Sequence, residues 1–118
     1  MSLEIHLLGQ FKLQQDDQPI ELPSRPAQSL LAYLAINAGV PHRREKLAGL
    51  LWPDSTEENA RGYLRQALWR IKKSLEEHDL QAEDYLDSDK INISFNAEAD
   101  YWLDTQELLR KTDSLSPE

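Results

Sequence analysis

The residues best suited to binding chemistry lie in one helix-sized segment, 59–75, which reads NARGYLRQALWRIKKSL. The segment has no acidic side chain, and its five basic residues are Arg61, Arg65, Arg70, Lys72 and Lys73. Arginine and lysine neutralise phosphates, and arginine and glutamine can hydrogen-bond to base edges in a groove wide enough for one helix. These residue types at this density predict recognition of a polyanion.

The formal charge of −8 over 118 residues hides a separation of the two signs along the chain. Residues 25–73 contain nine Lys and Arg against four Asp and Glu, whereas residues 76–118 contain three against thirteen. Attraction to a partner depends on the local surface and not on the sum. We therefore expect one face to attract a polyanion, while the acidic remainder discourages nonspecific adhesion.

Helical periodicity separates a core side from an outward side in this segment. The apolar residues fall in one stripe about 100° wide, and every basic residue lies outside it. The stripe consists of Ala60, Leu64, Ala67, Leu68, Ile71 and Leu75. Gly62, Gln66, Trp69 and Lys73 lie opposite. Exposing a large indole to solvent is unfavourable, and a glycine within a helix lowers its stability by about 1 kcal/mol relative to alanine. Both residues therefore favour a partner that covers this face.

Some of these residues have two interpretations from sequence alone. Trp69 either packs against DNA sugars or a thymine methyl, or packs on a hairpin of its own domain. Arg43 and Arg44 open a helix, where free amide groups and the helix dipole favour a phosphate. The alternative for both arginines is an exposed helix start without a ligand.

Strands are predicted on either side of a helical region. Interrupted apolar alternation over residues 3–23, with turn residues at 9–10 and 16–19, predicts a small antiparallel sheet. Residues 85–87 and 91–95 predict a hairpin around a tight turn at 88–90. From residue 101 the apolar pattern fits either a docking strand or another helix.

Three helices are predicted, over about 24–39, 43–51 and 55–78. Ser24 is the expected N-cap of the first helix, and Gly39 its C-cap. Ser55 and Glu58 have capping-box spacing at the start of the third. The second is expected to bury three leucines, Leu47, Leu50 and Leu51. A sheet, three helices and a hairpin in this order predict an α+β winged helix-turn-helix, with an N-terminal antiparallel sheet and a C-terminal wing hairpin.

Five runs of residues resemble one bacterial family. They are Leu22–Arg25, Leu30–Ala35, Arg44–Leu47, Leu51–Pro53 and Asn59–Lys72. Their joint order and spacing resemble the N-terminal domain of the antibiotic regulatory protein (SARP) type of transcriptional activator. That domain is an OmpR/PhoB-like winged helix, usually followed by a helical bacterial transcriptional activator domain (BTAD). The similarity covers about residues 3–104.

The resemblance implies a four-stranded N-terminal sheet and a third helix lying in the major groove. It also implies promoter binding, often as tandem protomers on direct repeats, and contact with RNA polymerase through residues 52–56. Arg65, Arg70 and Lys72 match the family's basic positions in the recognition helix. The chain departs from the pattern at Pro26, where a basic residue is common, and at Trp69, where smaller residues are common. A further departure is the acidic wing turn at 87–90.

The sequence therefore predicts a winged-helix DNA-binding domain over residues 1–100, with residues 101–118 a linker or the truncated start of a following helical domain. The predicted function is sequence-specific binding of double-stranded promoter DNA for bacterial transcription regulation, as an activator. The alternative is a protein-interaction module whose basic, Trp-containing helix face docks on an acidic partner. The predicted DNA-binding residues are Arg61, Gly62, Arg65, Gln66, Trp69, Arg70, Lys72, Lys73, Arg43 and Arg44.

Several other classes of function are not expected. Without cysteine the chain has no disulfide and no thiolate metal site, and its three histidines lack metal-ligand spacing. Nothing assembles a nucleophile, a base and an orienting group, so we expect neither an enzyme nor a cofactor. No apolar run approaches the ~18 residues of a membrane span, and a signal-peptide layout is missing. These features favour a cytoplasmic protein with no membrane partner.

Overall fold

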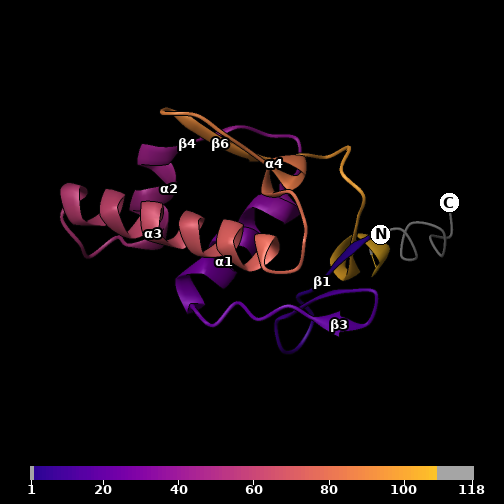
Figure 1. The fold of residues 1–118 in the computed structure, drawn as a ribbon. Coiled ribbons are helices and arrows are strands. Elements are labelled where there is room, and N and C mark those ends of the chain that lie inside the picture. Colours follow the sequence, from indigo (N-terminus) through magenta and orange to yellow (C-terminus); the bar gives the residue numbers. More distant parts are fainter. Residues whose placement is uncertain (1, 109–118) are drawn as a thin grey trace, which may run out of the picture. The chain divides into compact units, whose positions relative to one another are not determined.

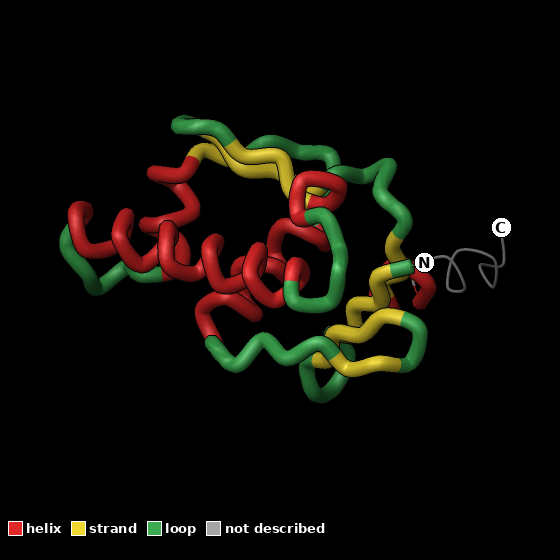
Figure 2. Tube along the Cα trace, in the orientation of Figure 1, coloured by secondary structure: helices red, strands yellow, loops and turns green. Residues whose placement is uncertain are grey.

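The structure of this protein is a computed structural model that describes residues 2–108 (Figures 1 and 2). Helices and strands are both present, which confirms the predicted α+β class. The chain divides into two compact units. Of the described residues, unit 1 contains 2–20 and 100–108, and unit 2 contains 21–99.

Unit 1 is built on a four-stranded sheet with the order β3-β2-β1-β7. Its strands are β1 (Leu3–His6), β2 (Lys12–Gln15), β3 (Gln18–Pro19) and β7 (Tyr101–Leu103). The first three pair in antiparallel fashion, as predicted, whereas β7 pairs in parallel with β1. Residues 101–103 thus form a docking strand, one of the two forms expected from residue 101, and helical residues 104–108 follow. Residues 109–118 lie outside the described part of the chain.

Asp104 fastens the end of β7 to the end of β1. Its carboxylate accepts hydrogen bonds from the Leu7 amide, at 3.0 Å to Oδ1 and 2.9 Å to Oδ2, and from the Leu8 amide at 3.0 Å. Burial raises the pKa of Asp104. The hydrogen bonds from these amides and from Thr105, together with the charge of His6, lower it by more, so the pKa lies below its ordinary value. The ionised carboxylate therefore stabilises this connection.

Unit 2 contains the helices and the hairpin (Figure 1). Its helices are α1 (Arg25–Ile36), α2 (Arg44–Leu51), α3 (Glu57–Glu76) and α4 (Ala82–Tyr85). Its strands are β4 (His42–Arg43), β5 (Leu86–Ser88) and β6 (Asn92–Phe95), which form a second, antiparallel sheet of order β4-β6-β5. The three predicted helices and the hairpin are confirmed. Sequence reasoning missed α4 and the short strand β4.

The helix ends confirm one predicted cap and correct two others. Ser24 Oγ accepts a hydrogen bond from the Ala27 amide at 3.3 Å, so the predicted N-cap of α1 is confirmed. The C-cap of α1 is Asn37, not Gly39, because the Asn37 side chain and amide both donate to the Tyr33 carbonyl. At the start of α3 the Thr56 hydroxyl accepts from the Asn59 amide at 3.1 Å, so the capping box predicted at Ser55 is wrong by one residue.

The core of unit 2 lies beneath α3, which packs against α1 and α2. All six residues of the predicted apolar stripe of α3 are buried, which confirms the orientation of this helix. In α2 the buried residues are Leu47 and Ala48, whereas Leu50 is 55% exposed and Leu51 is half-buried, which corrects the prediction for these two leucines. The centre of the buried side of α2 lies between Leu47 and Ala48. Leu50 points about 110° away from that centre and therefore reaches solvent. Within the described residues, no helix combines the length and hydrophobicity needed to cross a bilayer.

Candidate nucleic-acid interface

The exposed surface of α3 has two flanks, which follow from the spacing of its residues. At 3.6 residues per turn, Arg61 and Arg65 lie on one flank, and Tyr63 and Arg70 lie on the other. Trp69 lies on the outward side between them. A separate hollow in the surface of unit 2 borders each flank. Seven of the ten predicted contact residues therefore line one hollow or the other, whereas Gly62, Lys72 and Lys73 line neither.

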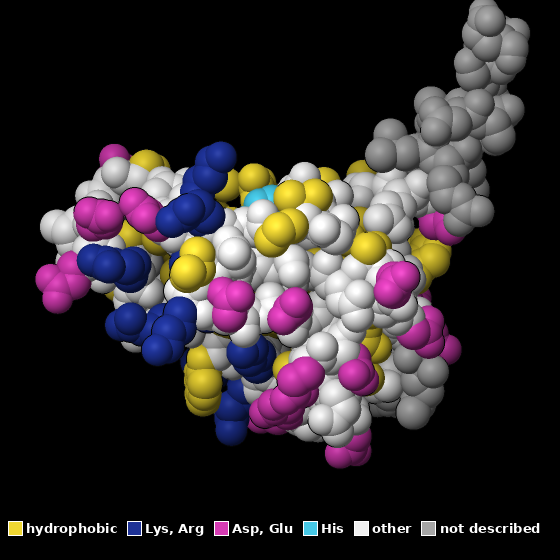
Figure 3. Space-filling model, turned by 90° about the horizontal axis from the view of Figure 1, so that it is seen from above, with side chains coloured by type: hydrophobic (Ala, Val, Ile, Leu, Met, Phe, Trp, Pro, Cys, Tyr) yellow, Lys and Arg dark blue, Asp and Glu magenta, His cyan; other side chains and the backbone are white. Residues whose placement is uncertain are grey.

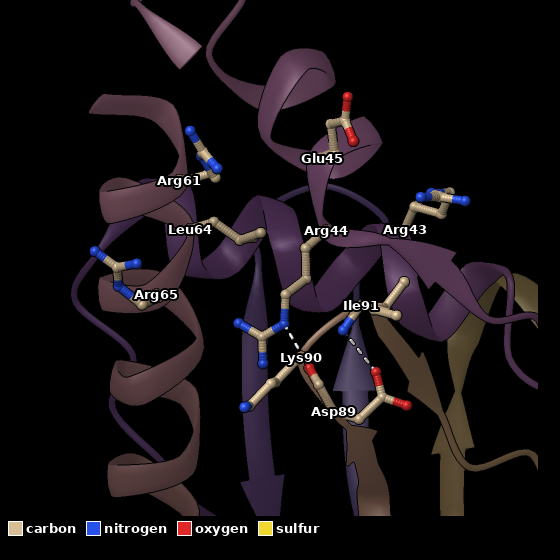
Figure 4. Close-up of a pocket in the computed structure, with 9 residues that line it drawn as sticks. All are labelled: Arg43, Arg44, Glu45, Arg61, Leu64, Arg65, Asp89, Lys90 and Ile91. Atoms are coloured by element: carbon tan, nitrogen blue, oxygen red, sulfur yellow. Dashed lines mark hydrogen bonds between the residues drawn. The ribbon is translucent and has the colours of Figure 1, made fainter. Parts of the chain in front are cut away.

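The first flank borders a hollow of about 580 Å³, which we call the basic hollow (Figure 4). It lies between α3, the start of α2 and the turn of the hairpin. Its lining residues are Arg43, Arg44, Glu45, Arg61, Leu64, Arg65, Asp89, Lys90 and Ile91. Five of these side chains are basic and two are acidic. The structure thus brings together four of the predicted contact residues from separate segments of the chain.

Strand β4 fixes the two arginines at the start of α2, Arg43 and Arg44. The register pairs Arg43 with Asn92 of β6, and the Arg44 amide donates to the Ile91 carbonyl at 2.8 Å. The Arg44 side chain extends to the hairpin turn, where its Nε donates to the Asp89 carbonyl oxygen at 2.7 Å (Figure 4). The start of α2 and the hairpin turn are therefore joined, and Arg44 is held by a bond that leaves its terminal nitrogens for a ligand.

The acidic residue of the hairpin turn has a structural role. Asp89 Oδ1 accepts hydrogen bonds from the amides of Ile91 and Asn92, both at 2.7 Å. The bond from Asn92 and then that from Ile91 lower the pKa of Asp89, and the charge of Arg44 adds a smaller lowering. A carboxylate that accepts two amide bonds closes a tight turn. Local geometry therefore accounts for the acidic residue at position 89 of this turn.

We expect acid to destabilise the protein below about pH 4. In the folded chain the pKa values of Asp89 and Asp104 are lowered, and an unfolded aspartate has a pKa of about 3.9. Above the pKa of the unfolded chain, such a carboxylate contributes its full stabilisation. This stabilisation is lost as the pH falls through the lower pKa of the folded chain. Urea midpoints measured from about pH 5 to about pH 2 should decline less steeply for Asp89→Asn, which keeps the oxygen acceptor without its charge. Equal declines would contradict this assignment.

Lys72, one of the predicted DNA contacts, is engaged within the protein. Its side chain is half-buried, and Nζ donates to Ser88 Oγ of β5 at 3.2 Å. Lys72 therefore lies against the hairpin, whereas the other basic residues of α3 are exposed. The hairpin turn supplies Lys90 and the 58% exposed Ile91 to the basic hollow instead. The sequence pointed to Lys90 only through its position in the wing turn of the resembled family, and it gave no signal for Ile91.

The second flank of α3 borders a hollow of about 410 Å³, the aromatic hollow. Its lining residues are Ser24, Pro26, Trp52, Tyr63, Gln66, Ala67, Trp69 and Arg70. They come from the start of α1, the end of α2 and α3, and none comes from the hairpin. The indole of Trp69 is 55% exposed. Trp69 therefore does not pack on the wing, which was one of its two predicted interpretations.

The basic side chains of α3 carry uncompensated charge. Arg70 Cζ and Lys73 Nζ lie 5.3 Å and 5.7 Å from the centroid of the Trp69 ring, in cation–π geometry. Over residues 2–108, no carboxylate forms an ion pair with any of the five basic residues of this helix. Figure 3 shows Lys and Arg side chains gathered in one part of the face that it displays. This arrangement presents a cationic surface to an external anion.

Comparison with known proteins finds a solved structure of similar fold but assigns no family. No family model and no curated protein matches the chain. Its structure is similar to that of Mycobacterium tuberculosis EmbR, solved in complex with a low-affinity phosphopeptide. The TM-score is 0.68 at 21% sequence identity, and the match covers 80% of this chain but 25% of the EmbR chain. The two proteins thus share a fold over a part of EmbR.

Proposed function

We propose that this chain is a winged helix-turn-helix domain that binds double-stranded promoter DNA sequence-specifically in bacterial transcription regulation. The observation that carries the proposal is the basic hollow, where five basic side chains from three segments converge beside a helix free of carboxylates from residue 59 to residue 75. EmbR, a SARP-family regulator of similar fold, supports this interpretation.

In the proposed complex, α3 lies in the major groove. That groove is about 12 Å wide and admits one helix. Arg43, Arg44 and Lys90 then contact phosphates on one side of the groove, while Arg65 and Gln66 reach base edges. By the family resemblance, the protein is an activator that binds as tandem protomers on direct repeats and contacts RNA polymerase through residues 52–56.

A second candidate function is a protein-interaction module, and the aromatic hollow favours it. An exposed tryptophan beside two cations suits an interface anchor for an acidic partner. That function predicts no preference among DNA sequences, and loss of partner binding in Trp69→Ala. The basic side chains of α3, none of which forms an ion pair within residues 2–108, favour DNA as the first candidate.

Selection of bound sequences from a random duplex pool, at about physiological salt, tests the proposal directly. Enrichment of a short motif, especially as a direct repeat, would support a sequence-reading domain. Its affinity should then fall with salt with a log–log slope of about −0.9 per phosphate contact. A domain that binds no duplex even at low salt would overturn the proposal in favour of the second candidate.

Gly62→Ala is expected to stabilise the fold and to weaken DNA binding. A Cβ at position 62 would meet only Arg65 Nη2, at an ordinary 3.9 Å, so the fold itself does not require glycine there. Alanine should raise the free energy of unfolding by up to about 1 kcal/mol through helix propensity. A methyl group on the outward face should meanwhile obstruct a DNA backbone that comes close.

Urea unfolding and duplex titration of the same Gly62→Ala preparation separate the two effects. A suitable control is Gly49→Ala in α2, which also has open space at the Cβ position and lies outside the basic hollow. The control should gain stability without losing affinity. If Gly62→Ala bound DNA like the wild type, close approach at this residue would be excluded.

A further inference from the structure

The aromatic hollow is an unusual surface for the flank of a DNA-binding helix. Trp52 and Tyr63 pack ring to ring, with centroids 5.8 Å apart, and Pro26 from the start of α1 completes an apolar wall. Trp69 borders the same hollow with 55% of its surface exposed. Phosphates offer nothing apolar to this surface, so charge neutralisation does not explain it.

The charges around the hollow favour a nucleic acid over a neutral ligand. Its lining contains one cation, Arg70, and no carboxylate, and Lys73 stands beside the indole. Gln66 lies in the same lining and can hydrogen-bond to adenine N6 and N7. The hollow is also continuous with the outward face of α3, because Gln66, Trp69 and Arg70 belong to both. An occupant must therefore present an apolar group next to negative charge.

The floor of the major groove offers one common apolar group, the 5-methyl of thymine. From that chemistry we infer that Trp69 is a specificity-determining residue that contacts thymine methyl groups at the aromatic hollow. Gln66, placed beside it, reads an adenine at or next to the same step. This inference rests on the proposed DNA-binding function and adds the base preference of one flank of α3.

The test replaces thymine by deoxyuridine, which removes the methyl group and keeps the base pair. Each thymine of the selected motif is replaced in turn, and duplex affinity is measured by fluorescence anisotropy at about physiological salt. For the wild type, at least one replacement should weaken binding about fourfold, the expected cost of losing one buried methyl group. In Trp69→Ala the thymine and deoxyuridine duplexes should bind equally.

Leu50→Ala provides the matched control. Leu50 is as exposed as Trp69, at 55%, but does not line the aromatic hollow, so this variant should keep the fourfold preference for thymine. Thermal unfolding verifies that each variant is folded. The wild-type comparison of the two duplexes needs no variant, so it tests the inference whatever the stability of Trp69→Ala.

Several results would overturn the inference while leaving DNA binding intact. They are a selected motif without thymine, wild-type affinity that ignores the deoxyuridine replacements, and a Trp69→Ala protein that still prefers thymine. Unchanged DNA binding by Trp69→Ala on both duplexes would assign the hollow to a protein partner. Absence of duplex binding by the wild type at low salt would instead overturn the proposed function and this inference together.

Discussion

Replacing Arg61 and Arg65 together by alanine is expected to weaken duplex binding by about 100-fold at physiological salt. The two residues lie one turn apart on α3, both are exposed, and both line the basic hollow. No carboxylate among the described residues pairs with them, so their charge is available to DNA. For every phosphate that the variant no longer neutralises, the salt slope should also become shallower by about 0.9.

Single alanine variants distinguish residues that contact phosphates from residues that read bases. A residue that contacts phosphate should weaken all sequences alike, whereas one that reads a base should relax the preference at one position by about 1–3 kcal/mol. We expect Arg65→Ala, like Gln66→Ala, to behave in the second way. Selection from a duplex pool with each variant measures this difference.

Lys46→Ala is the control for the arginine variants. It removes one positive charge from α2 without touching the lining of the basic hollow, so its effect on affinity should be small. Because the replaced side chains are exposed, all these variants should unfold within about 0.5 kcal/mol of the wild type. A double variant that bound DNA as tightly as the wild type would remove this flank of α3 from the interface.

The features that sequence predicted well depend on local periodicity. The apolar stripe of α3 spans four turns, so its phase is strongly determined, and every member is buried in the structure. The same phase placed Arg61, Arg65 and Trp69 outside the core, and all three are exposed. Local capping chemistry likewise fixed Ser24 at the start of α1.

The features that sequence missed depend on contacts between distant segments. Arg44 and Asp89 are 45 positions apart, and their bond requires β4 to pair with the hairpin. A two-residue strand carries no periodic signal. The bond from Lys72 to Ser88 likewise exists only because the hairpin packs beside α3. An angular position on a helix therefore could not show that Lys72 is engaged within the protein.

Phe95→Ala is expected to lower the free energy of unfolding by about 3–5 kcal/mol. Phe95 is fully buried in β6, and its ring lies 6.4 Å from that of Tyr85. Its carbonyl accepts a hydrogen bond from the Gly39 amide at 2.8 Å, which ties the hairpin to the turn after α1. Removing the ring leaves a cavity at the point where these elements meet.

Urea unfolding measures this loss, as a lower midpoint with an unchanged slope. Ile91→Ala is the matched control, because Ile91 flanks the same strand but is 58% exposed, so the change should stay within about 0.5 kcal/mol. A loss below about 1 kcal/mol for Phe95→Ala would contradict its place in the core.

Stability and DNA binding should respond together to the loss of Phe95. Domains of this size are stable by about 5–15 kcal/mol, so the expected loss consumes a large part of that margin. The strand that holds Phe95 also pairs with β4, which positions Arg43 and Arg44 at the basic hollow. Loosening β6 should therefore weaken phosphate contacts even in the molecules that remain folded. Ile91→Ala leaves Phe95 and the pairing of β6 with β4 intact. This variant should therefore alter DNA affinity only by removing the apolar side chain that Ile91 presents at the hairpin turn.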